Sequence, residues 1–194
     1  ATADEEAGGY LGAGWLVENR PELFQNIGYV LNEGGFGVKI SDSLQMMSVE
    51  VTQKVPLWLR LTTHGQPGHG STPATDTAVT RLVQAAHNIV EAEFPVRVVK
   101  PVDTMFKSMA RFQPTDQARK DYADIPSAIQ REGFLQQLLR EQPGNYAVLK
   151  NTCSLTRLEG SDKINVVPPQ ASLELDCRLL PDQSPDAFIA EMKL

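Results

Sequence analysis

The chain has 194 residues, of which 41% are hydrophobic and 22% are charged, a composition typical of one domain or two small ones with a hydrophobic core. The net charge is −6 and no basic cluster occurs, which argues against a nucleic-acid partner and against binding to an anionic membrane surface. No apolar run approaches the length of a membrane span, and the sequence does not indicate a compartment.

The first nine residues place two adjacent glutamates, preceded by Asp4, between a short apolar lead-in and a glycine pair. Glu5 and Glu6 follow residues 1–3, and Gly8 and Gly9 come soon after them. This pattern is typical of a strand that ends at a site and turns into a helix. Neighbouring residues of a strand point to opposite faces, so the two carboxylates are expected to have different roles. The alternative is a solvated acidic segment.

A second carboxylate follows a second predicted strand. A short helix is predicted around Trp15. The apolar run at residues 27–31 then predicts a buried strand, and Glu33 comes directly before Gly34 and Gly35. The repetition of a carboxylate and two glycines favours a functional role over an ordinary polar turn.

The character of the sequence changes at Lys54, where alternating apolar residues predict a strand with one buried face. A loop rich in glycine and proline follows at residues 64–73 and contains His69. The helix after this loop carries a predicted apolar stripe, formed by Val79, Leu82, Val83, Ala86 and Val90. Prolines and amphipathic patches between residues 95 and 148 predict an insertion of short helices with a structural role.

The C-terminal third predicts two strands and a helix. Residues 149–158 form the first strand, and a turn at residues 162–169 contains Asn165. Residues 171–179 alternate strictly between apolar and polar side chains, which predicts a strand with Arg178 on its polar face. Ser184 is placed to cap a final helix, because a proline and an acidic residue follow it.

From residue 55 the predicted order is therefore strand, helix, strand, strand, helix. This order is typical of a ferredoxin-like α+β fold with an antiparallel sheet and two helices, here without its last strand. The two cysteines, Cys153 and Cys177, both lie in predicted strands. They are expected to be small buried hydrophobic residues rather than metal ligands or a disulfide.

Four motifs, taken in this order, resemble the co-catalytic zinc metallopeptidase family that includes aminoacylase, carboxypeptidase G and carboxypeptidase S. They are Asp4-Glu5-Glu6 with its glycines, Tyr29 to Glu33, Gly68 to Pro73, and Lys163 to Pro168 together with Asp176 to Pro181. The insertion is most similar to the carboxypeptidase S branch. The resemblance implies that residues 1–54 are part of an α/β catalytic zinc-binding domain and that residues 55–194 are a lid or dimerisation domain.

The resemblance also implies roles for the acidic residues. Glu5 corresponds to the general base, and Glu6 and Glu33 correspond to ligands of two zinc ions. In the carboxypeptidase S branch the later ligand can lie one position earlier, which is Asn32 here. Asparagine is a poor zinc ligand, so the role is assigned to Glu33.

The remaining implied roles belong to the lid. His69 corresponds to the histidine that stabilises the oxyanion, in dimeric relatives within the neighbouring subunit's site. Asn165 and Arg178 correspond to the pair that holds the substrate's carboxylate. The implied substrate is a small peptide or an N-acyl amino acid with a free carboxylate, and the implied partner is a second copy of the protein.

Part of the family's ligand set has no counterpart in this sequence, namely an upstream histidine, a metal-bridging aspartate and a C-terminal histidine. The isolated chain is therefore expected to be inactive and to bind zinc weakly, because two carboxylates do not complete a tetrahedral site. A second function also stays open, in which the chain is a non-catalytic ferredoxin-like binding or dimerisation module.

Overall fold

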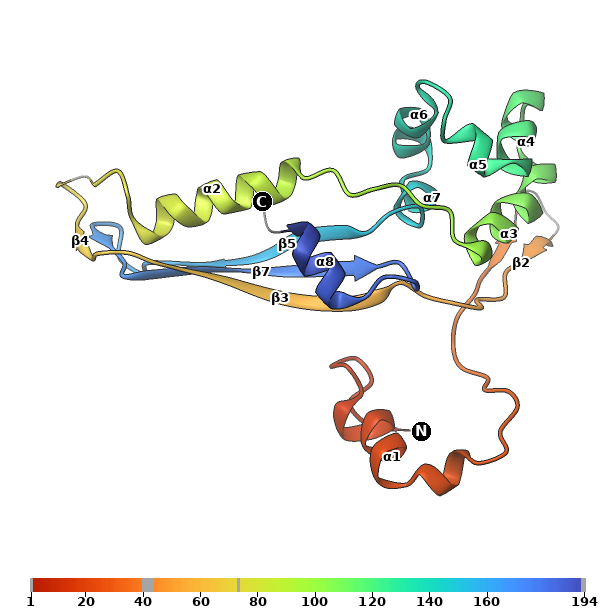
Figure 1. The fold of residues 1–194 in the computed structure, drawn as a ribbon, viewed down its shortest axis with the longest axis horizontal. Coiled ribbons are helices and arrows are strands. Elements are labelled where there is room, and N and C mark those ends of the chain that lie inside the picture. The colour runs from red at the N-terminus through yellow and green to blue at the C-terminus, as the bar shows by residue number, and fades with distance from the viewer. Residues whose placement is uncertain (1, 40–43, 73, 193–194) are drawn as a thin grey trace. The chain divides into compact units, whose positions relative to one another are not determined.

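The computed structural model describes residues 2–39, 44–72 and 74–192 (Figure 1). Two motif residues, Ala1 and Pro73, lie outside the described residues. The chain divides into two compact units, residues 1–50 and residues 51–194.

The first unit consists of a turn, short helices and a hairpin. The predicted helix around Trp15 is confirmed, because a π-helical turn leads directly into α1. The described elements are the π-helix Tyr10–Gly14, α1 (Trp15–Asn19), the 3₁₀ helix Pro21–Phe24, β1 (Gly37–Lys39) and β2 (Leu44–Met47). β1 and β2 pair antiparallel.

The two strands predicted in the first unit are not formed. Residues 2–9 contain turns rather than a strand, and residues 27–31 belong to no helix or strand. Tyr29 is 94% exposed and Leu31 is 98% exposed, so the prediction of a buried strand is wrong. A buried strand needs partners on both sides for its backbone, and the only strands described in this unit, β1 and β2, pair with each other.

The second unit is built on a three-stranded antiparallel sheet, which confirms the predicted fold class. Its strands are β3 (Val55–His64), β5 (Thr152–Glu159) and β7 (Gln170–Leu179), in the order β3-β7-β5. Two helices, α2 (Ala78–Glu91) and α8 (Pro185–Met192), complete the layout (Figure 1). The strand alternation places one apolar face toward the helices and leaves the other face polar.

The main core lies between that apolar face and the two helices. Phe188 of α8 is completely buried, and burial of such a side chain contributes about 1.5–3 kcal/mol. Phe94 stacks against it at a ring distance of 5.1 Å. The other buried members of this core are Ala78, Leu82, Ala171, Leu173, Leu175, Cys177 and Leu179. The core is centred on β7, which contributes most of its buried residues.

Side-chain caps fix the starts of both helices. The Thr77 hydroxyl accepts a hydrogen bond from the Thr80 backbone N–H at 3.1 Å, and the Thr80 hydroxyl accepts one from the Thr77 N–H at 2.8 Å. This reciprocal pair is a capping box. Ser184 accepts a hydrogen bond from the Ala187 N–H at 3.1 Å, as predicted for the start of α8.

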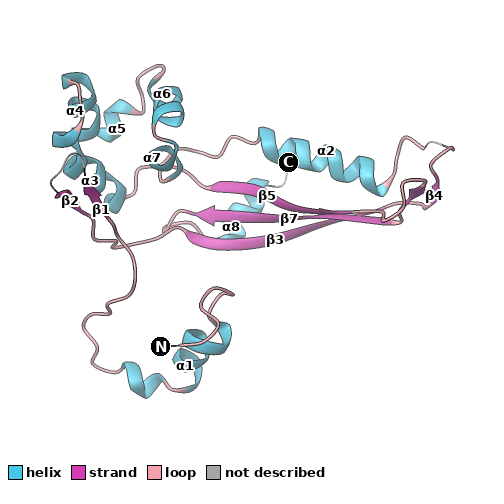
Figure 2. Cartoon of the chain, turned by 180° about the vertical axis from the view of Figure 1, so that it is seen from behind, coloured by secondary structure: helices cyan, strands magenta, loops and turns pink. Residues whose placement is uncertain are grey.

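The apolar stripe predicted for α2 is only partly correct. α2 runs alongside the sheet (Figure 2). Ala78 and Leu82 are buried in the core, with Ala86 and Ile89 packed against it. Three predicted members are exposed instead, by 38%, 63% and 64%, namely Val79, Val83 and Val90. The reason is that the apolar arc of α2 is wider than one contact surface, and the side of the arc that contains Ala78, Leu82 and Ile89 packs on the core. We call Val79, Val83 and Val90 the outer strip.

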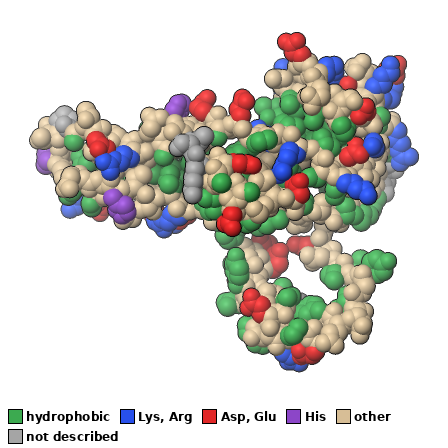
Figure 3. All heavy atoms as spheres, viewed as in Figure 1, with side chains coloured by type: hydrophobic (Ala, Val, Ile, Leu, Met, Phe, Trp, Pro, Cys, Tyr) green, Lys and Arg blue, Asp and Glu red, His purple; other side chains and the backbone are tan. Residues whose placement is uncertain are grey.

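The predicted insertion forms a helical subdomain with its own core. The elements are α3 (Lys100–Met109), the 3₁₀ helix Ala110–Phe112, α4 (Asp116–Ala123), α5 (Ile125–Ala128), α6 (Phe134–Glu141) and α7 (Pro143–Ala147). Its core contains Val102, Phe106, Tyr122, Ile125, Ala128, Phe134, Leu138 and Leu149. Acidic and basic side chains are interspersed over these helices (Figure 3). No helix in the described part of the chain is both long and apolar enough to cross a bilayer.

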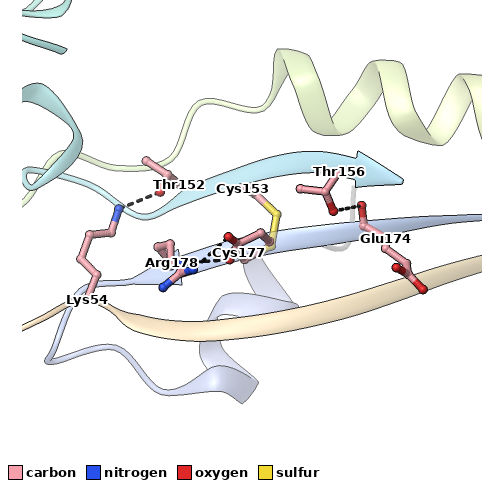
Figure 4. The surroundings of a disulfide bond; sticks show 8 residues. Lys54, Thr152, Cys153, Thr156, Glu174, Cys177 and Arg178 are labelled. Carbon is pink, nitrogen blue, oxygen red and sulfur yellow. Dashed lines mark hydrogen bonds and ion pairs between the residues drawn. A yellow bond between two sulfur atoms is a disulfide. The ribbon is translucent and has the colours of Figure 1, made fainter. Parts of the chain in front are cut away.

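The prediction for the cysteines is wrong in one respect. Cys177 is fully buried, as expected, but it forms a disulfide with Cys153 (Figure 4). The cause is the strand register, because Cys153 on β5 lies directly opposite Cys177 on β7. Opposite residues of an antiparallel pair point to the same face, which brings the two sulfur atoms together.

Candidate functional site

The end of the sheet at which β7 begins, at Gln170, brings two of the predicted site segments together. There β4 (Gly68–His69) pairs with β6 (Val166–Val167), with His69 opposite Val166. The Gly70 N–H donates to the carbonyl oxygen of Asn165 at 2.8 Å. We call this part of the molecule, residues 68–72 and 164–167, the tip. The tip therefore holds His69 and Asn165 on adjoining loops of one small structure.

The His69 side chain is exposed and is held by the turn that follows it. The Thr72 N–H donates to the His69 carbonyl at 2.9 Å, which closes the turn. The Nδ1 atom of His69 lies 2.7 Å from the Ser71 hydroxyl oxygen and accepts a hydrogen bond from the Ser71 N–H at 3.2 Å. An exposed imidazole fixed on one edge can offer its other nitrogen to an oxygen atom of a ligand.

Arg178 lies at the opposite end of β7 from the tip. It faces Pro56 on β3 and Thr152 on β5, whereas the tip adjoins Gln170. The eight residue steps from Gln170 to Arg178 span about 26 Å at ~3.3 Å each. The structure therefore does not bring Arg178 and Asn165 together within one chain.

The guanidinium of Arg178 already has a carboxylate partner. Its Nε donates to Asp176 Oδ1 at 2.8 Å and its Nη2 donates to Oδ2 at 3.0 Å. The hydrogen bonding that Arg178 donates to Asp176 is the main cause that raises the pKa of Arg178, so the guanidinium keeps its charge. Guanidinium has five N–H donors, and Asp176 takes only the edge that contains Nε. The edge that contains Nη1 remains suited to a second carboxylate.

Lys54 lies close to Arg178, which sequence reasoning did not predict. Its ammonium donates to the Ala147 carbonyl at 3.1 Å and to the Thr152 hydroxyl at 2.8 Å (Figure 4). Burial lowers the pKa of Lys54 to about 8, with smaller contributions from the positive charges of Arg178 and Lys150. No sequence signal could have found this cluster, because it depends on the pairing of β3, β7 and β5.

The predicted acidic residues lie in the first unit. Glu5 and Glu6 are exposed in a turn that is closed by a hydrogen bond from the Gly9 N–H to the Asp4 carbonyl at 2.6 Å. Asp4 also accepts a hydrogen bond from the Leu11 N–H at 2.9 Å, so this carboxylate fastens the turn to the helix. Glu33 is exposed in an irregular segment directly before the glycine pair.

These carboxylates do not by themselves fit a zinc ion. Within the described residues, no group of three or more His, Cys, Asp or Glu side chains could hold a metal. A catalytic zinc takes three protein ligands and a water molecule, with imidazole or thiolate among the usual donors. Glu6 and Glu33 can therefore be at most part of such a site.

A model of a known protein family matches most of the chain. The family is described as the peptidase dimerisation domain, M20_dimer, and the match covers residues 51–194. The chain belongs to this family. The resemblance stated from the motifs is thereby confirmed at the level of the M20 peptidases, and the ferredoxin-like second unit is its dimerisation domain.

Curated relatives of this M20 domain extend the similarity to the first unit. The chain is 28% identical over 192 residues to the N-fatty-acyl-amino acid synthase/hydrolase PM20D1 of Xenopus tropicalis, which covers 93% of the chain and 35% of the relative. It is 29% identical over 193 residues to aminoacylase-1 of Sus scrofa, which covers 98% of the chain and 36% of that protein. The chain thus spans about a third of the length of these relatives.

Solved structures of other peptidases were also matched. One is an M20 family metallo-carboxypeptidase from Sulfolobus solfataricus, with 17% identity and a TM-score of 0.45 over 73% of this chain and 39% of that one. Another is human carnosine dipeptidase 1, with 13% identity and a TM-score of 0.41 over 75% of this chain and 34% of that one.

Proposed function

We propose that this chain is the central part of a zinc-dependent hydrolase that cleaves the amide bond of small peptides or N-acyl amino acids with a free carboxylate. The observation that carries the proposal is the match of residues 51–194 to the M20 dimerisation domain. The similarity to aminoacylase-1 over 98% of the chain adds support, because it includes the segment with Glu5, Glu6 and Glu33. The helical subdomain with its separate core favours the carboxypeptidase S branch.

In this proposal the first unit carries the acid–base chemistry. Glu5 accepts the proton of the attacking water and later passes it to the leaving amine. Glu6 and Glu33 would each contribute one carboxylate to a pair of zinc ions, and the remaining ligands would have to come from outside this chain. The bound zinc would polarise the amide carbonyl.

The second unit supplies groups that bind the substrate. His69 donates a hydrogen bond to the oxyanion that forms when water attacks the amide carbon. Asn165, on the adjoining loop of the tip, and Arg178 receive the substrate's carboxylate. Because Arg178 and the tip of one chain lie at opposite ends of β7, a substrate that meets both requires two subunits. We therefore assign His69 to the site of the partner subunit in a homodimer.

The experiment that tests this proposal compares two neighbouring glutamates in the full-length protein. Glu5→Gln is expected to lower kcat by about 10²–10⁴-fold while zinc stays bound, because the amide keeps the shape and removes only the proton acceptor. Glu6→Gln is expected to lower the zinc content itself. Metal analysis and kinetics on an N-acyl amino acid separate the two results. Loss of zinc in Glu5→Gln would show that the roles of Glu5 and Glu6 are exchanged or that both assignments are wrong.

The second candidate function is a non-catalytic dimerisation module. The specific observation in its favour is that the family match covers only the second unit, while the described residues contain no group that could hold a metal. A full-length protein that dimerises but hydrolyses no N-acyl amino acid or dipeptide in the presence of zinc would favour this function.

A further inference from the structure

The hydrogen bonds of the tip define which nitrogen of His69 can carry a proton. The Ser71 backbone N–H points at Nδ1 from 3.2 Å, and this group can only donate. Nδ1 must therefore present its lone pair to Ser71. A neutral imidazole has one donor and one acceptor nitrogen, so the proton of neutral His69 is on Nε2.

The Ser71 hydroxyl strengthens the same arrangement. Its oxygen lies 2.7 Å from Nδ1, and a hydroxyl can rotate to donate to this lone pair. Both groups of Ser71 hold the same edge of the ring, and His69 and Ser71 are both exposed. The opposite edge of the ring, with Nε2, is then the edge that can meet a ligand.

We propose that Ser71 is a positioning residue that fixes His69 in the Nε2–H tautomer and orients this N–H toward the oxyanion. The inference rests on the proposed function for its catalytic consequence, although the tautomer itself does not depend on it. The ligand group recognised in this way is a negatively charged or strongly polarised oxygen, which accepts but does not donate a hydrogen bond. The Asn165 carbonyl supports the arrangement, because it anchors Gly70 between the two residues.

The first test measures the tautomer directly. Long-range ¹H–¹⁵N NMR correlations of the 194-residue chain, recorded well above the usual histidine pKa of about 6.5, distinguish Nδ1–H from Nε2–H in each imidazole. The chain has three histidines, so His64 and His87 are internal controls. His69 is expected to show only the Nε2–H form. Ser71→Ala keeps the backbone N–H at 3.2 Å but removes the hydroxyl, the closer partner at 2.7 Å, so Nε2–H is expected to remain the major form with a measurable fraction of Nδ1–H. Ser71→Thr keeps the hydroxyl and is expected to restore the single form.

The second test measures the consequence for catalysis in the full-length protein. Ser71→Ala is expected to lower kcat by about threefold to tenfold, the factor that corresponds to one net hydrogen bond, with little change in KM. The matched control is Ser161→Ala, because Ser161 is also an exposed turn residue whose hydroxyl bonds locally, to the Lys163 carbonyl at 2.9 Å. This control is expected to leave kcat unchanged.

The two tests distinguish failure of the positioning role of Ser71 from failure of the catalytic role of His69. An unchanged His69 tautomer in Ser71→Ala would overturn the positioning role, as would equal losses of kcat in Ser71→Ala and Ser161→Ala. An unchanged kcat in His69→Gln, with the wild-type tautomer fixed as expected, would instead refute the catalytic role assigned to His69 under the proposed function.

Discussion

At the scale of single residues, the cationic cluster around Lys54 makes stability depend on pH. The pKa of Lys54 falls from 10.5 to about 8 on folding, chiefly because the ammonium is partly buried. Between these two values the unfolded chain binds more protons than the folded chain, so the free energy of unfolding rises with pH. Below about pH 8 both states are protonated, and the cost of holding the charged ammonium is fully present.

The corresponding prediction uses a variant that cannot titrate. In urea unfolding between pH 8 and pH 10.5, Lys54→Met is expected to show a smaller rise in unfolding free energy than the wild type. Lys120→Met is the control, because Lys120 is exposed on α4, and it is expected to keep the wild-type slope. Equal slopes in Lys54→Met and wild type would show that the burial of Lys54 does not perturb its protonation.

Arg178 is predicted to recognise the substrate's carboxylate through the edge that Asp176 leaves open. In the full-length protein, Arg178→Met is expected to raise KM by about 10–100-fold for substrates with a free carboxylate, as a charged hydrogen bond contributes about 1.5–3 kcal/mol. The same substrates as amides should be affected far less. Arg119→Met, an exposed arginine paired with Asp116 on α4, is the control. An equal rise in KM for acid and amide substrates would show that Arg178 has only a structural role, in its ion pair with Asp176.

At the scale of elements, α2 carries two apolar surfaces, and the described residues cover only one of them. The outer strip is rotated from the buried stripe by about 100°, the angle of one helical residue. Its three valines recur at spacings of four and seven residues, so they lie on one side of the helix, with the exposed His87 between Val83 and Val90. Since the family is a dimerisation domain, a second copy of this chain is the occupant that we propose for the outer strip.

This proposal predicts a difference between adjacent positions of α2. Val83→Glu is expected to shift the chain from dimer to monomer, because it places a charge in the contact. Gln84→Glu adds the same charge to the neighbouring exposed residue and is expected to leave the dimer intact. Light scattering coupled to size-exclusion chromatography gives both masses. If both variants have the mass of a dimer, the interface lies elsewhere on the molecule.

At the scale of the whole molecule, the sequence predicted the second unit well because its signals are local. The strict alternation around Leu175 depends on one strand, and the Ser184 cap depends on one turn. Pairing between distant segments was not predictable, so the Cys153–Cys177 disulfide was missed. The apolar run at residues 27–31 suggested a buried strand, yet this strand needs neighbours that the described part of the first unit does not provide.

In the candidate site, too, features that adjacent residues determine were predictable, and features that depend on distant segments were not. The turn that contains His69 and Ser71 is set by adjacent residues, and the family resemblance of the motifs implied an oxyanion role for the histidine, which stays a prediction. The role proposed for Ser71 rests on its N–H and its hydroxyl, which both face Nδ1 of His69, and no sequence motif indicated it. The separation of Arg178 from Asn165 depends on the length and direction of β7, and it is the reason for placing a complete site between two subunits.

If His69 of one subunit serves the site that contains Glu5 of the other, mixing two inactive variants should restore activity. Full-length Glu5→Gln and His69→Ala proteins are each expected to be nearly inactive alone. After subunit exchange, half of the dimers are mixed and each mixed dimer holds one intact site, so roughly a quarter of the wild-type activity is expected. If the mixtures stay inactive although native mass spectrometry shows that mixed dimers are present, His69 does not act in the site of the other subunit.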